Sequence, residues 1–214
     1  MLSDFMQGYN CCVFCYGQTG SGKTYTQTGG SGSYNDRGLM PRALEQLFQQ
    51  IEIQKDRQYE IFISYCQILN EGGFDLLSAQ GTSDGLQPTH EQLQRVKLVE
   101  QPETGVIVVK NLSAFQAKTV EDALNILWSG DLNRVVTATS QNQSSSRSHC
   151  IFTINLHSKP AGSEVVRKSK FHFVDLAGSE RVSQTGAEGV ILNQARYINV
   201  SLFHLETVIQ ALAR

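Results

Sequence analysis

A glycine-rich octapeptide near the start of this 214-residue chain constrains its fold more than any other stretch. It reads Gly17-Gln18-Thr19-Gly20-Ser21-Gly22-Lys23-Thr24 and fits the pattern Gly-x-x-x-x-Gly-Lys-Ser/Thr. The glycines let the backbone curl so that its amides face a phosphate chain. The lysine brings positive charge to the β- and γ-phosphates, and the following hydroxyl can ligate Mg²⁺. A glycine-rich turn matching by chance in such a chain is roughly a one-per-cent event, so the octapeptide predicts a nucleoside triphosphate site.

The segments on either side of the octapeptide support this prediction. Residues 11–16 form a short apolar run, which is typical of a buried strand. A helix is expected to begin near Lys23, and its positive dipole end would face the phosphates. Strand, glycine loop and helix follow one another in the order that a phosphate-binding loop requires.

Length and composition narrow the class of protein. The chain is long enough for one sizeable domain, and its net charge of −2 provides no basic field for nucleic acid or an anionic membrane. No apolar run approaches the roughly 20 residues that span a bilayer, and no signal peptide is evident. A cytoplasmic domain is therefore expected. Alternation along a strand would point Cys12 and Cys15 to opposite faces, so all five cysteines are interpreted as reduced packing residues rather than metal ligands: Cys11, Cys12, Cys15, Cys66 and Cys150.

Hydrophobic periodicity predicts alternating helices and strands around a central sheet. Glycines 72 and 73 are expected to end one strand, and Thr119 is expected to cap a helix that ends near Gly130 with Trp128 on its apolar face. The predicted helices are a segment ending near residue 10, 41–51, 119–129 and 190–213; the predicted strands are 11–16, 59–69, 96–99, 106–109, 151–157 and 170–175.

Two later tracts could complete a phosphate site. Asp175-Leu176-Ala177-Gly178 ends a predicted strand, where an aspartate can hold Mg²⁺ directly or through water and the glycine amide can meet a γ-phosphate. Ordinary turn residues are the alternative, and the glycine loop favours the functional interpretation. The tract Ser144-Ser145-Ser146-Arg147-Ser148-His149 is either a solvated loop or a source of hydroxyls for the metal's waters. Its arginine could pair with Glu180, whereas His149 is assigned to packing or hydrogen bonding.

Together these residues resemble a kinesin motor domain. The octapeptide matches the kinesin nucleotide loop, Asn142-x-x-Ser145-Ser146-Arg147-Ser148-His149 matches the first switch, and Asp175-Leu176-Ala177-Gly178-Ser179-Glu180-Arg181 matches the second. The matches are collinear and cover essentially the whole chain. The resemblance implies an α/β P-loop NTPase of kinesin-motor type, with a central, mostly β-sheet flanked by helices. The sequences of residues 70–77 and 197–205 resemble those of the kinesin subgroup associated with cilia and flagella.

The resemblance also implies ATP and Mg²⁺ as cofactors and gives individual residues roles. The loop residues Gly17 to Thr24 would hold the phosphates, and Tyr25 would stack on adenine unless it only packs. Ser145 and Ser146 would touch the γ-phosphate and the metal's waters. The metal would be held by Thr24 and Ser146, with Asp175 acting through water. The catalytic residues would be Lys23, Ser146, Arg147, Gly178 and Glu180. Arg147 and Glu180 would form an ion pair over the attacking water.

A kinesin-like chain is expected to hydrolyse ATP and to couple hydrolysis to movement on microtubules, in the cytoplasm and in a cilium or flagellum. Kinesin motors are longer at both ends, so residues 1–214 are expected to be a partial motor domain lacking N-terminal strands and C-terminal tubulin-binding and neck elements. Residues 11–16 would then form an unprotected sheet edge. Val200 and Gln184 stand where the family often carries basic residues, which should weaken binding to acidic tubulin.

Two other functions remain open from the sequence. An impaired motor remnant could act only as a nucleotide- or tubulin-binding module, as the missing ends and Val200 suggest. A GTPase is disfavoured by the amino-acid sequence of the first switch.

Overall fold

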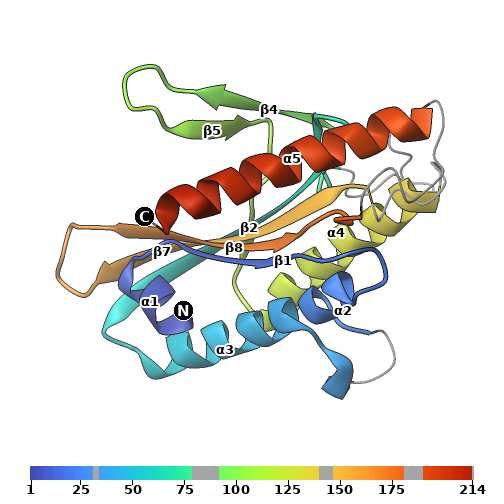
Figure 1. The fold of residues 1–214 in the computed structure, drawn as a ribbon. Helices are drawn as coiled ribbons and strands as arrows, with labels where there is room; N and C mark the ends of the chain where they lie inside the picture. Colours follow the sequence, from blue (N-terminus) through green and yellow to red (C-terminus); the bar gives the residue numbers. More distant parts are fainter. Residues whose placement is uncertain (31–33, 79–91, 140–146, 181–189, 214) are drawn as a thin grey trace.

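A single mixed sheet organises the computed structural model, which describes residues 1–30, 34–78, 92–139, 147–180 and 190–213. The strand order is β1-β8-β7-β2-β3-β4-β5, and β6 pairs with β2. The strands are β1 (Cys11–Cys15), β2 (Arg57–Leu69), β3 (Gly72–Asp75), β4 (Arg95–Glu100), β5 (Ile107–Lys110), β6 (Phe115–Ala117), β7 (His149–Pro160) and β8 (Arg167–Asp175). The helices are α1 (Leu2–Gln7), α2 (Lys23–Gln27), α3 (Leu39–Ile53), α4 (Val120–Thr139) and α5 (Val190–Leu212). Helices α1 to α4 lie on one side of the sheet, and α5 crosses the other (Figure 1).

The core lies between the sheet and the helices α1, α3 and α4. Alternate residues of the central strands point into it, and the Tyr65 and Phe152 rings meet edge to face with centroids 5.4 Å apart. Helix α3 contributes Leu44 and Leu47 to the core, and α4 contributes Leu127; all three are fully buried. This core fixes the strands whose ends carry the phosphate-binding segments.

The register of β1 and β8 places these segments side by side. The two strands run parallel, and Cys15 at the end of β1 pairs with Asp175 at the end of β8. The glycine loop and the Asp-x-x-Gly segment therefore leave the sheet at the same edge, as the carboxyl ends of parallel strands do in α/β nucleotide-binding proteins.

Helix α4 is longer than predicted. It continues through Gly130 to Thr139, although glycine was expected to end it. A Cβ at Gly130 would overlap the Tyr65 ring and lie 3.1 Å from Leu77, so this glycine allows the helix to approach the sheet closely. The prediction for Trp128 was also wrong, because its side chain is 40% exposed. The predicted cap of this helix is present: the Asp122 amide donates to Thr119 Oγ1 at 3.1 Å, and the Thr119 amide donates to Asp122 Oδ2 at 3.1 Å.

The break after β2 occurs at Asn70 and Glu71 rather than at the two glycines that follow. Both residues have left-handed backbones, with φ of 49° and 61°, and they join paired residues Leu69 and Gly72. This is the geometry of a two-residue hairpin turn of type I′. Gly73 belongs to β3, where a Cβ would overlap Val96 of the neighbouring strand.

The described cysteines are free thiols, and their burial differs. Cys66 and Cys150 are buried, whereas Cys12 is exposed, so the prediction that every cysteine packs inside the protein was wrong for Cys12. In the parts of the chain that the structure describes, no helix combines the length and apolarity needed to span a membrane.

Strand β1 is the first strand in the sheet order, as the sequence predicted for an edge strand. It pairs with β8 alone among the described strands, and Phe14 on it is 42% exposed. An edge strand leaves about half of its amides without a ladder partner. We expect amide hydrogens of β1 to exchange faster than those of β7, which is paired on both sides. We also expect Phe14→Lys to reduce light scattering by aggregates; equal protection of β1 and β7 would contradict the prediction.

Candidate nucleotide-binding site

The glycine loop forms an open turn between β1 and α2. Gly20 and Gly22 have left-handed backbones, with φ of 80° and 90°, which explains why glycine occupies both positions. A Cβ at either residue would meet no atom within 4 Å, so the loop faces open space rather than packed protein. The first turn of α2 is closed by the Thr26 amide, which donates to the Gly22 carbonyl at 2.8 Å. The local geometry therefore leaves room for a phosphate chain over the loop.

A hydroxyl from the loop and a carboxylate from β8 meet beneath this turn. Thr24 Oγ1 donates a 2.7 Å hydrogen bond to Asp175 Oδ2, although the two residues are 151 positions apart. The Asp175 side chain is 1% exposed, and its Oδ1 is buried without a hydrogen-bond partner in the described part of the chain. Because a buried carboxylate oxygen rarely lacks a partner, this orphaned atom beside a hydroxyl fits a hydrated Mg²⁺.

Arg134 of α4 completes this cluster, and the sequence analysis did not assign it to the site. Its Nη2 lies 2.5 Å from Asp175 Oδ2 and 3.2 Å from Thr24 Oγ1, and its side chain is 4% exposed. Helical spacing places Arg134 on the same face as Leu127 and Gly130, which face the core. A cation on the buried face of a helix requires a buried anion, but the sequence provided no such signal, because the helix was expected to end near Gly130, before Arg134.

Lys23 and Glu180 lie at the opening of the loop. Lys23 Nζ donates to the carbonyls of Gly17 and Gln18, at 2.8 and 2.9 Å. Glu180 Oε2 accepts the Thr19 amide at 2.9 Å, and Glu180 Oε1 accepts the Thr19 hydroxyl. Partial burial would raise the pKa of Glu180, but the hydrogen bonds from Thr19 and the charge of Lys23 outweigh it and lower that pKa below its ordinary value.

Gly178 holds the Asp-x-x-Gly segment against the glycine loop. A Cβ there would overlap both the Thr19 hydroxyl and the Glu180 carboxylate, so a side chain at this position would displace these two groups from each other. The neighbouring Ser179 amide donates to the Gly17 carbonyl at 3.1 Å. The two predicted phosphate-binding segments are therefore in direct contact.

The structure gives fewer contacts, or none, for the other predicted site residues. Ser145 and Ser146 lie outside the described residues, so their contacts with phosphate and metal stay predictions. Arg147 is half-buried, and the ion pair with Glu180 also stays a prediction. The Tyr25 ring is 56% exposed and its hydroxyl lies 3.4 Å from Asp36 Oδ1, which leaves the ring face accessible for the predicted adenine contact.

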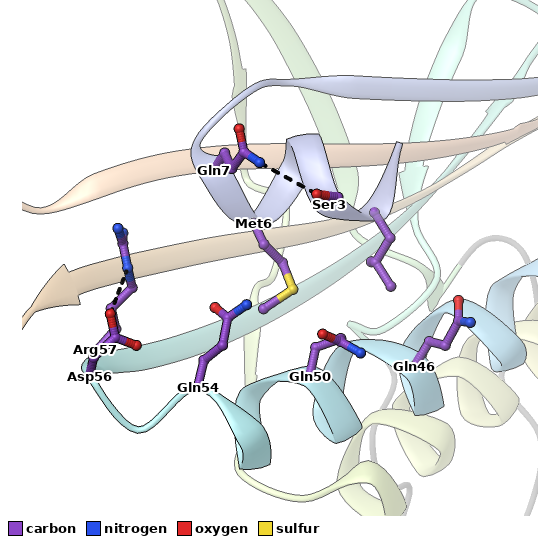
Figure 2. Close-up of a pocket in the computed structure, with 9 residues that line it drawn as sticks. Ser3, Met6, Gln7, Gln46, Gln50, Gln54, Asp56 and Arg57 are labelled. Atoms are coloured by element: carbon purple, nitrogen blue, oxygen red, sulfur yellow. Dashed lines mark hydrogen bonds and ion pairs between the residues drawn. The ribbon is translucent and has the colours of Figure 1, made fainter.

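A second hollow lies between α1 and the end of α3, apart from the glycine loop. Figure 2 shows glutamine side chains along its α3 wall and the Asp56–Arg57 pair, 3.9 Å apart, at one end. Arg57 is the one cation among its lining residues. A single, already paired cation does not fit a triphosphate, so the glycine loop remains the candidate nucleotide site.

Comparison with known proteins identifies the family. The family model for the kinesin motor domain matches residues 1–214. This chain belongs to the kinesin motor domain family. It is 44% identical to kinesin-like protein KIF9 of Mus musculus over 99% of the chain, and 38% identical to kinesin-like protein KLP1 of Chlamydomonas reinhardtii over 100% of the chain. It spans 26% of the length of each of these relatives.

A solved kinesin structure agrees with the fold. The structure of a fast kinesin superposes with a TM-score of 0.79 at 36% identity, covering 92% of this chain and 53% of the other. The predicted P-loop NTPase fold of kinesin-motor type is thereby confirmed. Kinesins are microtubule-stimulated ATPases, they generally bind nucleotide with Mg²⁺, and they are associated with the cytoskeleton.

Proposed function

We propose that this chain binds ATP with Mg²⁺, hydrolyses it and couples hydrolysis to microtubule binding and movement. The observation that carries the proposal is the 2.7 Å hydrogen bond between Thr24 and Asp175, which brings the glycine loop and the Asp-x-x-Gly segment into one site. Family membership supports the same activity. We further propose that the protein acts on cytoplasmic microtubules, including those of a cilium or flagellum, since residues 70–77 and 197–205 resemble that kinesin subgroup.

The residues of the site would divide the work as follows. Lys23 would exchange the Gly17 and Gln18 carbonyls for the β- and γ-phosphates. Thr24 would ligate Mg²⁺, and Asp175 would accept hydrogen bonds from its waters. The bound metal supplies positive charge that neutralises the phosphates during transfer. The Gly178 amide would meet the γ-phosphate, while the hydroxyls of Ser145 and Ser146 would approach it from the first switch.

Glu180 and Arg147 would act at the attacking water. The carboxylate of Glu180 is held at the loop opening by Thr19, and its lowered pKa keeps it ionised near neutral pH. An ionised carboxylate there can orient water and accept its proton. Pairing with Arg147 would close the site over that water.

Helix α5 presents an exposed surface for the microtubule. Tyr197, Val200 and Phe203 are 43%, 42% and 65% exposed on it. A nucleotide-dependent shift of the Asp-x-x-Gly segment would reposition this helix.

The main rival function is a remnant that binds nucleotide or tubulin without turnover. Microtubule co-sedimentation, with and without a non-hydrolysable ATP analogue, combined with phosphate release, separates the two. The proposal requires nucleotide-dependent co-sedimentation and ATP turnover that rises with microtubule concentration. Binding without turnover supports the remnant, and the absence of nucleotide binding overturns both.

The exposed Val200 allows a specific prediction for the microtubule interaction. We expect Val200→Lys to strengthen microtubule binding by about two- to fivefold at low salt, because an added surface charge pair contributes up to about 1 kcal/mol. The gain should shrink as salt rises. Co-sedimentation across a salt series measures both effects, and Val208→Lys, at another exposed position on α5, is the matched control. A gain that does not depend on salt would contradict an electrostatic origin.

A further inference from the structure

His149 joins three segments that lie far apart in the sequence. It is the last residue of the serine-rich tract and the first of β7, which pairs with β8 so that Cys150 lies beside Asp175. Its Nδ1 accepts a hydrogen bond from the Ala177 amide at 3.1 Å. Its Nε2 lies 2.8 Å from Ser201 Oγ on α5. One imidazole therefore contacts both the Asp-x-x-Gly segment and the long helix.

The hydrogen-bond partners of His149 determine which of its two ring nitrogens carries the proton. A backbone N–H can only donate, so His149 Nδ1 must be the unprotonated nitrogen of the ring. The proton of the neutral ring then lies on Nε2, which donates to Ser201 Oγ. Ser201 in turn donates its own proton to the Ile198 carbonyl at 2.7 Å. All three hydrogen bonds run in one direction, from Ala177 to helix α5. Burial, partly opposed by the charge of Asp175, lowers the pKa of His149 and favours this neutral form.

Helix α5 needs such an attachment, because much of its surface faces solvent. Phe203, Val208 and Leu212 are 65%, 55% and 82% exposed, whereas Leu202 is buried. Ser201 and Leu202 are adjacent, so the hydrogen bond and the apolar contact hold the same turn of the helix. This turn is the one that would respond to a movement of Ala177.

We infer that His149 is a positioning residue that connects the Asp-x-x-Gly segment to helix α5, so that a shift of Ala177 moves the Ser201 turn. The connection deepens the proposed function, because it assigns a physical link between the nucleotide site and the helix proposed to face the microtubule. The hydrogen-bond chain itself does not depend on nucleotide and can be tested without it.

The first experiment measures the imidazole in the protein without nucleotide. Nitrogen-15 NMR of the ring at neutral pH should show a protonated Nε2 and an unprotonated Nδ1. Ser201→Ala should shift the Nε2 resonance, and Thr207→Ala should not. Thr207 is the matched control, because its hydroxyl donates to the Phe203 carbonyl of the same helix at 2.9 Å. A ring protonated on Nδ1, or one unaffected by Ser201→Ala, overturns the inference.

The second experiment measures coupling to the nucleotide. In the wild-type protein, a non-hydrolysable ATP analogue with Mg²⁺ should change amide exchange across residues 197–203. Ser201→Ala should remove this change while nucleotide affinity stays within about twofold, since the serine touches no proposed nucleotide contact. Thr207→Ala should preserve the change. An undiminished change in Ser201→Ala overturns the inference.

Two conservative replacements of His149 separate its two contacts. Asn places an oxygen near the Nδ1 position and can still accept the Ala177 amide, whereas Gln places a donor near the Nε2 position and can still reach Ser201. Each variant keeps one of the two hydrogen bonds and loses the other, so both variants should lose the nucleotide-dependent change in amide exchange across residues 197–203. Retention of the response in both variants refutes the link. Failure of the wild-type protein to bind nucleotide would count against the proposed function instead, and the NMR experiment would then decide on His149.

Discussion

Glu180→Ala is expected to lower microtubule-stimulated ATP turnover by about 10²–10³-fold, the usual cost of removing one contact made in the transition state. Nucleotide binding should persist, because the change also frees the Thr19 amide, which Glu180 now occupies at 2.9 Å. That amide belongs to the glycine loop and can then donate to a phosphate. Phosphate release and the affinity for a fluorescent ATP analogue, measured on the same sample, distinguish loss of turnover from loss of binding.

The pH dependence of Glu180 follows from its lowered pKa. A carboxyl whose folded pKa lies below its unfolded value of 4.5 stabilises the folded protein above that value, and the contribution is lost as the pH falls through the folded pKa. The carboxylate is therefore ionised throughout the neutral range, and the defect of Glu180→Ala should be constant there. Lys23→Ala is the contrasting variant, because it should lose both binding and turnover. Normal turnover in Glu180→Ala would refute the catalytic role.

The sequence was sufficient to locate the glycine loop and the strand and helix around it, because each fixed position has a local physical requirement. Gly20 and Gly22 need left-handed backbones. The apolar run before them does form a strand, although β1 is only partly buried and not the buried strand that was predicted. The Asp175 contact could also be anticipated, since the carboxyl ends of parallel strands meet at one edge of a sheet. This part of the site depends on backbone conformation and strand direction, both of which can be inferred from the local sequence.

Features that depend on the distance between elements could not be predicted. Gly130 looks like a helix end in the sequence, and only the position of Tyr65 shows that it permits close packing. Trp128 fits the apolar periodicity, yet it lies on the solvent-facing side of α4, next to the fully buried Leu127. Arg134 acts through partners on two other elements, Thr24 and Asp175. Such contacts come from the tertiary fold, which local propensity does not encode.

Arg134→Ala is expected to destabilise the folded protein by about 3–5 kcal/mol, because it leaves the buried Asp175 carboxylate without its cation. The two side chains are 4% and 1% exposed and 2.5 Å apart, so the variant would leave a buried carboxylate beside the space of the lost guanidinium. Asp131 lies 4.0 Å from Arg134 Nη1 and would lose the same partner. At about 2–4 °C per kcal/mol for a chain of this size, the midpoint of thermal unfolding should fall by roughly 6–20 °C.

A second replacement separates the lost charge pair from lost packing. Arg134→Met combined with Asp175→Asn removes both charges and keeps side chains of similar length, so it should be more stable than Arg134→Ala alone. Glu164→Ala breaks the exposed pair with Lys159, in which Glu164 is 97% exposed, and should change the midpoint little. If the double variant were no more stable than Arg134→Ala, an unpaired buried carboxylate would not be the main cost of losing Arg134. The Arg134–Asp175 ion pair would then serve to hold Thr24 and Asp175 in place at the metal site and would contribute little to the stability of the fold.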